Sequence, residues 1–127
     1  MSAPCDVEFT DEFGAWWDAR SEAEQESVDV SIRQLEACGP RLRFPDGSGI
    51  VGSRYGRIRE LLVQHKGRPL RVLYAFDPRR VAILLIGGDK SGNDPWYEEF
   101  IPLADRLYER HLAELRKEGL IDGKESR

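Results

Sequence analysis

The chain has 127 residues, of which 40% are hydrophobic and 33% are charged, and its formal net charge is −4 at pH 7. This balance predicts a single compact domain over residues 1–127, because the chain is too short for two domains and too apolar for wholesale disorder. No apolar run approaches the roughly 18 residues of a membrane span, and residues 1–10 lack the pattern of a signal peptide. We therefore expect a cytoplasmic protein with no membrane partner.

The charge is distributed unevenly along the chain. Residues 1–40 carry 2 basic and 10 acidic side chains, residues 41–80 carry 10 and 3, and residues 81–127 carry 7 and 10, which gives net charges of −8, +7 and −3. An asymmetry of this size arises by chance, or it marks a local anion site on an acidic protein. The location of the positive segment in the fold decides between the two interpretations.

The first 40 residues predict a short strand followed by two helices. Residues 6–9 alternate polar and apolar side chains, which is typical of a strand. Thr10 has the position of a helix N-cap, and the Ser21/Glu24 pair has the spacing of a capping box. The expected elements are a strand over 6–9, a helix after Thr10 that carries Phe13, Trp16 and Trp17, and a helix from Glu22 to about Cys38, ended by Gly39 and Pro40.

The rest of the chain predicts a sheet followed by a helix. Residues 41–56 are rich in Gly, Pro, Ser and Arg, which is typical of a loop. Three strands follow with hairpin-length connections, so neighbouring strands are expected to be antiparallel. The third is apolar on both faces and should be central. The expected elements are strands over 58–64, 70–76 and 81–86, then an amphipathic helix through Ala104–Leu115 that begins at Pro95 or Pro102.

The resulting order, β-α-α-β-β-β-α, separates the helices from a small, mostly antiparallel sheet. This is an α+β layout with an N-terminal helical hairpin and a C-terminal helix. The two outer segments are acidic, whereas the three sheet strands and their turns are basic. An anion is therefore expected to bind at the sheet.

Eight basic side chains lie on these strands and turns or shortly before the first strand. They are interpreted either as solvated strand and hairpin residues or as phosphate contacts, since guanidinium groups match phosphate oxygens. Tyr55 and Tyr74 lie among them and have rings that stack on bases in RNA-binding sheets. Arg71 is the most informative, because a charge inside an apolar strand must face a cleft or find a partner. The eight are Arg54, Arg57, Arg59, Lys66, Arg68, Arg71, Arg79 and Arg80.

A glycine pair, Gly87-Gly88, precedes Asp89-Lys90 at the end of the most apolar strand. One interpretation is a tight turn with glycines at positive φ. The other is that the glycines let the backbone approach a ligand while Lys90 is presented at the sheet rim. The spacing of a P-loop is absent, which argues against nucleotide hydrolysis.

Several other chemistries lack the residues they need. The sequence has no metal-ligand cluster and no GxSxG elbow, and His111 lies on the apolar face of the last helix, where a core histidine is expected. Arg, Lys and Tyr remain, and these suffice to cleave RNA without a metal or cofactor. The 2′-hydroxyl is an internal nucleophile, and clustered cations stabilise the charged phosphorane and favour proton transfer by a nearby Tyr or Lys.

Four stretches occur in a recognisable order: Arg59-Glu60-Leu61-Leu62, residues 71–78, residues 86–90 and Trp96-Tyr97. Together they resemble the phage-derived Gp49-like branch of the HigB/RelE toxin superfamily. The similarity extends over nearly the whole chain through Phe9, Phe13, Trp16 and the Gly39-Pro40 stop. The fold that this resemblance implies is an antiparallel sheet flanked by an N-terminal helix pair and a C-terminal helix, in agreement with the layout above.

The resemblance implies the toxin of a type II toxin–antitoxin system. Such a toxin is an endoribonuclease that cuts mRNA in the ribosomal A site, and a protein antitoxin, commonly a helix-turn-helix protein, silences it. The implied catalytic residues are Arg71 on the phosphate, Lys90 on the transition-state charge, and Tyr97 in stacking or proton transfer. Arg57 and Arg59 are the nearest matches to the RNA-contacting positions, and Arg68 and Tyr55 of the basic cluster are further expected RNA contacts.

Leu62 departs from the family pattern. The family typically has Glu-Leu-Arg where this chain has Glu60-Leu61-Leu62, so a leucine stands in place of an expected arginine. Two hypotheses follow. The chain is an active ribonuclease, or it is a weakened or inactive member that binds its antitoxin or RNA without cleaving.

Overall fold

The structure is a computed structural model that describes residues 5–42, 47–49, 57–89 and 95–122. Within these ranges five strands form one sheet in the order β1-β5-β4-β3-β2, with β1 parallel to β5 and the other pairs antiparallel. This confirms the α+β class and the predicted placement of the helices. The elements are β1 (Val7–Phe9), α1 (Asp11–Asp18), α2 (Glu22–Cys38), the 3₁₀ turn η1 (Gly39–Arg41), β2 (Gly47–Gly49), β3 (Arg59–Val63), β4 (Leu70–Phe76), β5 (Ala82–Asp89) and α3 (Pro95–Lys117).

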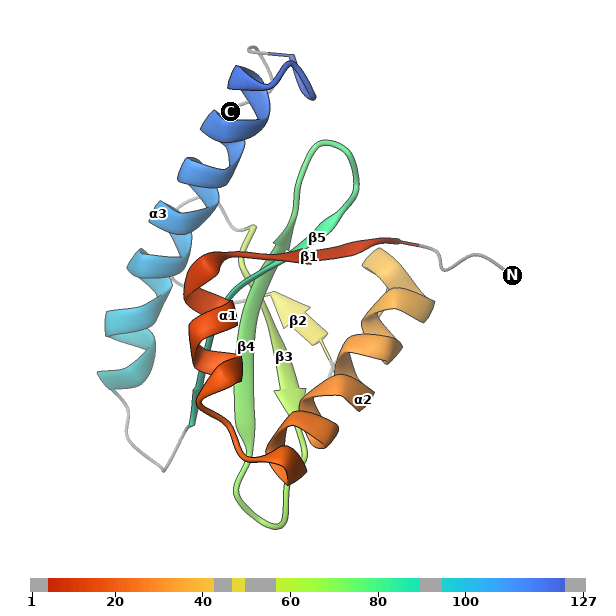
Figure 1. Cartoon of the computed structure of the whole chain (residues 1–127), viewed down its shortest axis with the longest axis vertical. Helices are drawn as coiled ribbons and strands as arrows, with labels where there is room; N and C mark the ends of the chain where they lie inside the picture. The colour runs from red at the N-terminus through yellow and green to blue at the C-terminus, as the bar shows by residue number, and fades with distance from the viewer. Residues whose placement is uncertain (1–4, 43–46, 50–56, 90–94, 123–127) are drawn as a thin grey trace.

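The sheet lies between two hydrophobic cores. Helices α1 and α2 cover one face, and α3 covers the other (Figure 1). Strand β4 serves both cores, because Val72 packs toward α1 and α2 while Leu73 packs toward α3. Strand β5 is also buried on both sides and lies between β1 and β4, which confirms the prediction of a central strand.

Local capping residues set the boundaries of the N-terminal helices. The Thr10 hydroxyl accepts a hydrogen bond from the Phe13 backbone N–H at 3.0 Å and donates one to the Leu85 carbonyl at 2.7 Å, which joins α1 to β5. Ser21 and Glu24 form the predicted capping box, with distances of 3.1 and 2.9 Å. Each cap satisfies backbone N–H groups that a helix leaves unpaired at its N-terminus.

Strand β5 contradicts one of the two interpretations of Gly87-Gly88, the tight turn. The strand runs on to Asp89, and neither glycine has a positive φ. The register with β4 shifts between Leu73 and Tyr74, so Leu85 is an extra residue and the alternation of faces changes after it. Gly87 then faces α1 and Gly88 faces α3.

Two tryptophans require these glycines. A Cβ at Gly87 would lie 2.4 Å from the Trp16 ring, and one at Gly88 would lie 2.3 Å from Trp96. Both distances are far below van der Waals contact, so any larger residue would push α1 or α3 away from the sheet. The close approach is to side chains of the chain itself, a possibility that the sequence interpretation did not include.

Two further observations concern the bounds of the elements: one strand was not predicted, and the start of the last helix is now determined. Strand β2 occurs inside 41–56, which was expected to be loop throughout, and the remainder of that stretch beyond Leu42 lies outside the described residues. Helix α3 begins at Pro95 and continues through Pro102 as one helix, although Pro102 has no N–H to donate to the preceding turn. Within the described ranges, none of the helices combines the length and hydrophobicity that crossing a bilayer demands.

Candidate active site

A hydrogen-bonded cluster of Arg71, Glu60 and Tyr97 lies on the α3 face of the sheet. Arg71 is in β4, where its Cα partners are Leu62 in β3 and Gly88 in β5. Its neighbours Leu70 and Val72 point into the core under α1 and α2, so the Arg71 side chain points to the opposite face. Glu60 lies on that same face, two residues before Leu62.

The Arg71 guanidinium and the Tyr97 hydroxyl converge on one carboxylate oxygen of Glu60. The Arg71 Nη1 donates to Glu60 Oε2 at 2.6 Å and to the Tyr97 hydroxyl at 2.6 Å, and that hydroxyl donates to Glu60 Oε2 at 2.5 Å. The Arg71 and Glu60 side chains are 16% and 12% exposed, so the ion pair is partly shielded from water. Arg71 has thus found a carboxylate partner within the chain, one of the two outcomes that its position predicts.

Trp96 places Tyr97 over the sheet. The Trp96 ring covers Gly88, the residue opposite Arg71 in the β4–β5 ladder. It packs edge-on against Tyr97 with the ring centroids 5.0 Å apart. The Arg71 guanidinium carbon lies 5.7 Å from the centroid of the Tyr97 ring. The missing side chain at Gly88 therefore lets the start of α3 come close enough for Tyr97 to reach Arg71 and Glu60.

The electrostatics of the cluster keep the Tyr97 hydroxyl protonated, so that it can donate a hydrogen bond. Burial and the hydrogen bond to the Glu60 carboxylate raise the pKa of Tyr97 well above its usual range, more than the nearby Arg71 charge lowers it. The phenol therefore stays neutral at physiological pH. This favours stacking and hydrogen-bond donation by Tyr97 over proton abstraction, the other role that the family resemblance allows.

Sequence reasoning missed Glu60 as a site residue. The signal that could have revealed it is the hairpin register: the structure pairs Leu62 with Arg71, so Glu60 lies diagonally across from Arg71 on the same face. A carboxylate and a guanidinium in such a diagonal pair are expected to meet. Glu60 appeared in the sequence only as part of the family pattern.

The predicted RNA-contacting arginines do not gather around Arg71. Arg57 points to α3, where its Nη2 bonds Glu109 at 2.8 Å and its guanidinium lies 4.4 Å from the Tyr108 ring centroid. Arg59 lies on the α2 face, where it donates to the Pro40 carbonyl at 3.3 Å. Each is held by contacts within the chain, which favours the interpretation of these two as structural residues.

Tyr74 does not offer a stacking surface. Its side chain is fully buried, at 0% exposure, in the core under α1 and α2. The expectation that it stacks on bases is therefore wrong, because alternation along β4 turns it away from the face that carries Arg71. Tyr55 and Lys90 lie outside the described residues, as does Arg54.

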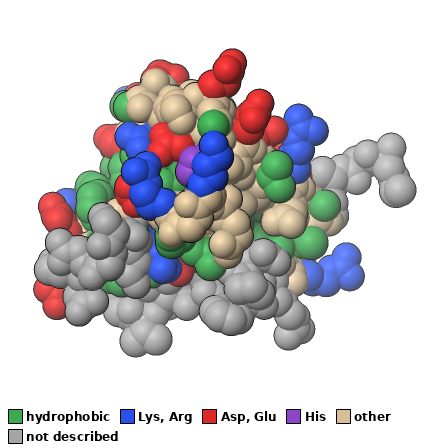
Figure 2. All heavy atoms as spheres, turned by 90° about the horizontal axis from the view of Figure 1, so that it is seen from below, with side chains coloured by type: hydrophobic (Ala, Val, Ile, Leu, Met, Phe, Trp, Pro, Cys, Tyr) green, Lys and Arg blue, Asp and Glu red, His purple; other side chains and the backbone are tan. Residues whose placement is uncertain are grey.

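Basic side chains also gather at the tip of the β3–β4 hairpin. Figure 2, which views the molecule from this end, shows Lys and Arg side chains beside a histidine, with acidic side chains close by. Arg68 bonds Glu24 at 2.8 Å and lies 3.6 Å from Asp89, while His65 shares a hydrogen bond with the Ser27 hydroxyl at 2.8 Å. Lys66 at the tip is exposed. The hairpin leads directly into Leu70 and Arg71, so these cations lie at the same end of the sheet as the cluster.

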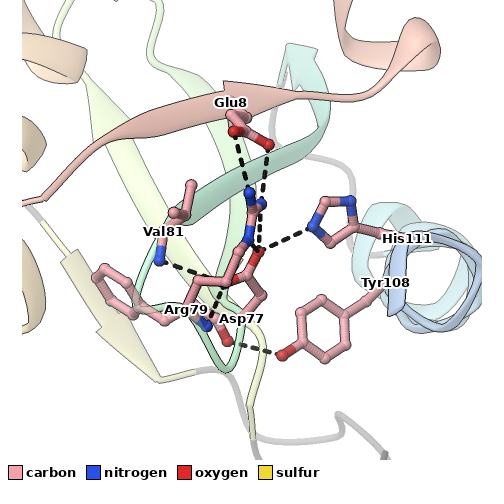
Figure 3. A network of polar contacts seen from close by, with 7 residues as sticks. Glu8, Asp77, Arg79, Val81, Tyr108 and His111 are labelled. Atoms are coloured by element: carbon pink, nitrogen blue, oxygen red, sulfur yellow. Dashed lines mark hydrogen bonds and ion pairs between the residues drawn. The ribbon is translucent and has the colours of Figure 1, made fainter. Parts of the chain in front are cut away.

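A second polar network surrounds Asp77 and joins three elements (Figure 3). The Asp77 carboxylate lies 2.9 Å from His111 Nε2 in α3 and 2.7 Å from Arg79 Nη2, and Arg79 in turn bonds Glu8 of β1 at 2.9 Å. Burial works to raise the pKa of Asp77, but the hydrogen bonds from His111 and Arg79 outweigh it and hold the pKa below its usual range. His111 is thus a paired histidine at the core boundary, as the sequence predicted. Among the described residues, no group of three or more Cys, His, Asp or Glu side chains is arranged to hold a metal ion.

Comparison with known proteins gives the family. Residues 15–109 match the model of the family described as phage-derived protein Gp49-like. Two Mycobacterium tuberculosis proteins that carry toxin names are similar to the chain. HigB2 is 39% identical over 102 residues, covering 79% of this chain and 51% of HigB2, and HigB3 is 41% identical over 99 residues, covering 77% and 85%. The chain thus spans about half the length of HigB2.

The crystal structure of the isolated Escherichia coli RelE toxin aligns with a TM-score of 0.48 and 12% identity, over 77% of this chain and 96% of RelE. The family match and the HigB3 similarity each cover most of the chain. The chain belongs to the Gp49-like family, and HigB2 and HigB3 are its relatives. The family expected from the sequence is confirmed.

Proposed function

We propose that this protein is the toxin of a type II toxin–antitoxin system and cleaves mRNA on the ribosome without a metal or cofactor. The toxin names of two relatives at about 40% identity support the biological role. The observation that carries the chemistry is the Arg71–Glu60–Tyr97 cluster, which combines a cation, a carboxylate and a neutral phenol on one face of the sheet. Together they supply charge stabilisation, a proton acceptor and a hydrogen-bond donor, which favour cleavage through the 2′-hydroxyl.

Arg71 binds the scissile phosphate. Its guanidinium matches the geometry of two phosphate oxygens and stabilises the extra negative charge of the phosphorane. In the free protein this cation is paired with Glu60. Binding therefore exchanges one anion for another at Arg71, and the incoming phosphate releases the Glu60 carboxylate from its ion pair.

Glu60 takes the proton of the 2′-hydroxyl. The 2′-oxygen then forms a bond to phosphorus, the bond from phosphorus to the 5′-oxygen breaks, and the products are a 2′,3′-cyclic phosphate and a 5′-hydroxyl. The proton that Glu60 gains is the one that the 5′-oxygen needs, so the step balances with no external co-reactant. DNA has no 2′-hydroxyl and is not a substrate by this route.

Tyr97 and Lys90 assist the reaction by hydrogen bonding and by charge stabilisation. The neutral Tyr97 hydroxyl donates a hydrogen bond to a phosphate oxygen while its ring supports a base. Lys90 adds a positive charge to the phosphorane, a role that the family resemblance implies. The exposed Lys66 at the hairpin tip extends the cationic surface along the backbone of the bound strand.

The partners follow from the same proposal. A net charge of −4 does not favour free RNA, so the protein reaches mRNA through the ribosome and needs only a local cationic site. A protein antitoxin, commonly of the helix-turn-helix class, silences the toxin. The site of action is the cytoplasm, where ribosomes translate.

One observation favours a second candidate function, an inactive relative that binds its partners without cleaving. Leu62 is the cross-strand neighbour of Arg71, at the position where the family pattern has arginine. With leucine there, the only described cation in the cluster is Arg71, and Glu60 neutralises it. A further positive charge to bind a second phosphate oxygen must therefore come from other residues, such as Lys90.

Induction of the chain alone in a bacterium separates the two functions. The toxin predicts arrest of growth and protein synthesis, which Arg71→Ala relieves. Normal growth with the present chain, together with arrest by the Leu62→Arg variant, supports the inactive relative instead. Arrest that persists in both the Arg71→Ala and Tyr97→Phe variants contradicts the site assignment.

A further inference from the structure

A groove separates α1 from α2 on the sheet face opposite the candidate active site. The two helices meet at the turn between them and diverge toward β1, which crosses the open end (Figure 1). The groove has a volume of about 550 Å³ and takes its residues from β1, α1, α2 and β5. We call it the α1–α2 groove.

Aromatic and aliphatic side chains form the walls of the α1–α2 groove. Phe9, Trp17 and Ile32 line it, and Phe9 is 65% exposed. An exposed phenylalanine beside two further partly buried apolar residues makes a larger apolar surface than scattered single residues do. Gly14 lies beneath the Phe9 ring and leaves the groove open on the α1 side.

The rim of the α1–α2 groove is acidic. Asp18, Asp29 and Glu36 line it, and it lies in the segment 1–40, whose net charge is −8. Asp29 pairs with Arg33 in the next turn of α2. Neither Asp18 nor Glu36 forms an ion pair with any residue in the described ranges. The groove therefore favours a ligand that carries both apolar groups and positive charge.

The edge of β1 borders the same groove. Strand β1 is at one edge of the sheet, and Asp6 and Thr10 hydrogen-bond to β5 through their backbone. Along a strand in a parallel ladder, successive residues direct their backbone N–H and C=O groups toward opposite edges of the strand. The backbone groups of Val7 and Phe9 therefore point away from β5. No strand lies beyond β1 among the described residues, and such an edge accepts an extended segment from another protein.

We propose that the α1–α2 groove is the docking site for a short, positively charged segment with apolar side chains that belongs to the antitoxin. The inference rests on the proposed function for the existence of that partner. Apolar side chains of the segment pack on Phe9, Trp17 and Ile32, and its basic side chains pair with Asp18 and Glu36. Docking there leaves Arg71, on the other face, uncovered, so partner binding and catalysis are separable by substitution.

The test uses the full-length chain and the protein encoded in the neighbouring reading frame. The groove variant is Asp18→Lys with Glu36→Lys, and the control is Glu26→Lys with Glu118→Lys, two exposed carboxylates outside the groove. Both variants change the net charge by the same amount. Affinity is measured by titration calorimetry at two salt concentrations, and thermal unfolding verifies that each variant is folded.

The proposal predicts that the groove variant binds about tenfold more weakly or worse and that the control binds as the native chain does. It also predicts weaker native binding at the higher salt concentration. Equal affinity of native chain and groove variant, or equal losses in both variants, overturns the docking site. A native chain that self-associates through the groove, seen as a dimer that the groove variant dissociates, also overturns it.

Growth arrest in the bacterium distinguishes this failure from a failure of the proposed function. If the groove variant still arrests growth but escapes neutralisation by the co-expressed partner, both proposals stand. If the native chain arrests growth and the partner neutralises native chain and groove variant alike, only the docking site fails. If the native chain neither arrests growth nor binds the partner, the proposed function fails, and the docking site fails with it.

Discussion

The guanidinium of Arg71 and the carboxylate of Glu60 are hydrogen-bonded at 2.6 Å across strands β3 and β4. The residue best placed to hold a phosphate is therefore neutralised by a neighbour in the free protein. Tyr97 donates to the same carboxylate, so the removal of any one residue takes one hydrogen-bond partner from each of the other two.

Substitutions of Arg71 are expected to lower the rate of RNA cleavage by amounts that depend on the replacement. Arg71→Ala removes the phosphate-binding cation and lowers the rate of RNA cleavage by about 100-fold or more. Arg71→Lys keeps the charge but loses the two-pronged geometry, and should retain part of the activity. Cleavage rates of the two variants at equal folded fraction check this order. Equal activity of both with the native chain contradicts a phosphate role for Arg71.

Glu60 and Tyr97 are expected to differ in importance. Glu60→Gln keeps the size and the hydrogen-bonding capacity but removes the proton acceptor, so the cleavage rate should fall by about 100-fold. Tyr97→Phe keeps the ring and removes only a hydrogen-bond donor, so the loss should be about tenfold or less. Single-turnover cleavage of ribosome-bound mRNA measures both. A larger loss for Tyr97→Phe than for Glu60→Gln would falsify the assignment of Glu60 as the base.

The glycine pair in β5 offers a matched test of how the site is positioned. Gly88→Ala pushes Trp96 away from the sheet and moves Tyr97, whereas Gly87→Ala pushes Trp16 on the opposite face. Both are expected to lower the free energy of unfolding by about 1–3 kcal/mol through overpacking. Only Gly88→Ala should also slow cleavage by the folded protein. Denaturant unfolding and cleavage assays on the same samples separate the two effects, and an equal slowing by both variants contradicts the role given to Trp96.

The buried Asp77 predicts a pH-dependent contribution to stability. Because its folded-state pKa is held below the usual Asp value, the contribution is present above about pH 4 and is lost as the pH falls through the folded-state pKa. Asp77→Asn is expected to lower the free energy of unfolding at pH 7 by about 3 kcal/mol, since it breaks a buried charge network. The difference between native and variant should shrink below about pH 4. A difference that is constant with pH contradicts the account.

The fold was predictable from sequence wherever its cause is local. The Thr10 cap and the Ser21/Glu24 box are decided within four residues, and the structure contains both. Strand β4 has the predicted bounds because its apolar residues and flanking turns lie in one short stretch. Strand β2 escaped prediction because Gly47–Gly49 has no apolar alternation, so only its pairing with β3 defines it.

The site was harder to predict because its contacts are remote in sequence. A one-residue bulge determines which face of the sheet Gly87 and Gly88 each occupy. Two tryptophans from helices that are distant in sequence leave no room for a side chain at either position. Arg71 stood out as a charge inside an apolar strand, and the family resemblance added Tyr97; the structure places the two within hydrogen-bond distance of each other. Their shared partner Glu60 was missed, because no pattern along the chain states which carboxylate a strand arginine will meet. The net charge of residues 41–80 indicated an anion site at the sheet. It overstated how many of the described cations there are available to bind RNA.

Cleavage of a defined mRNA on purified ribosomes tests the central claim most directly. The 5′ ends of the message are mapped after addition of the native chain or the Arg71→Ala variant, with ribosome-free mRNA as the control. The account predicts new 5′ ends within the ribosome-bound message for the native chain, and none for the variant or for ribosome-free mRNA. Intact message with the native chain, or equal cleavage by Arg71→Ala, would contradict it.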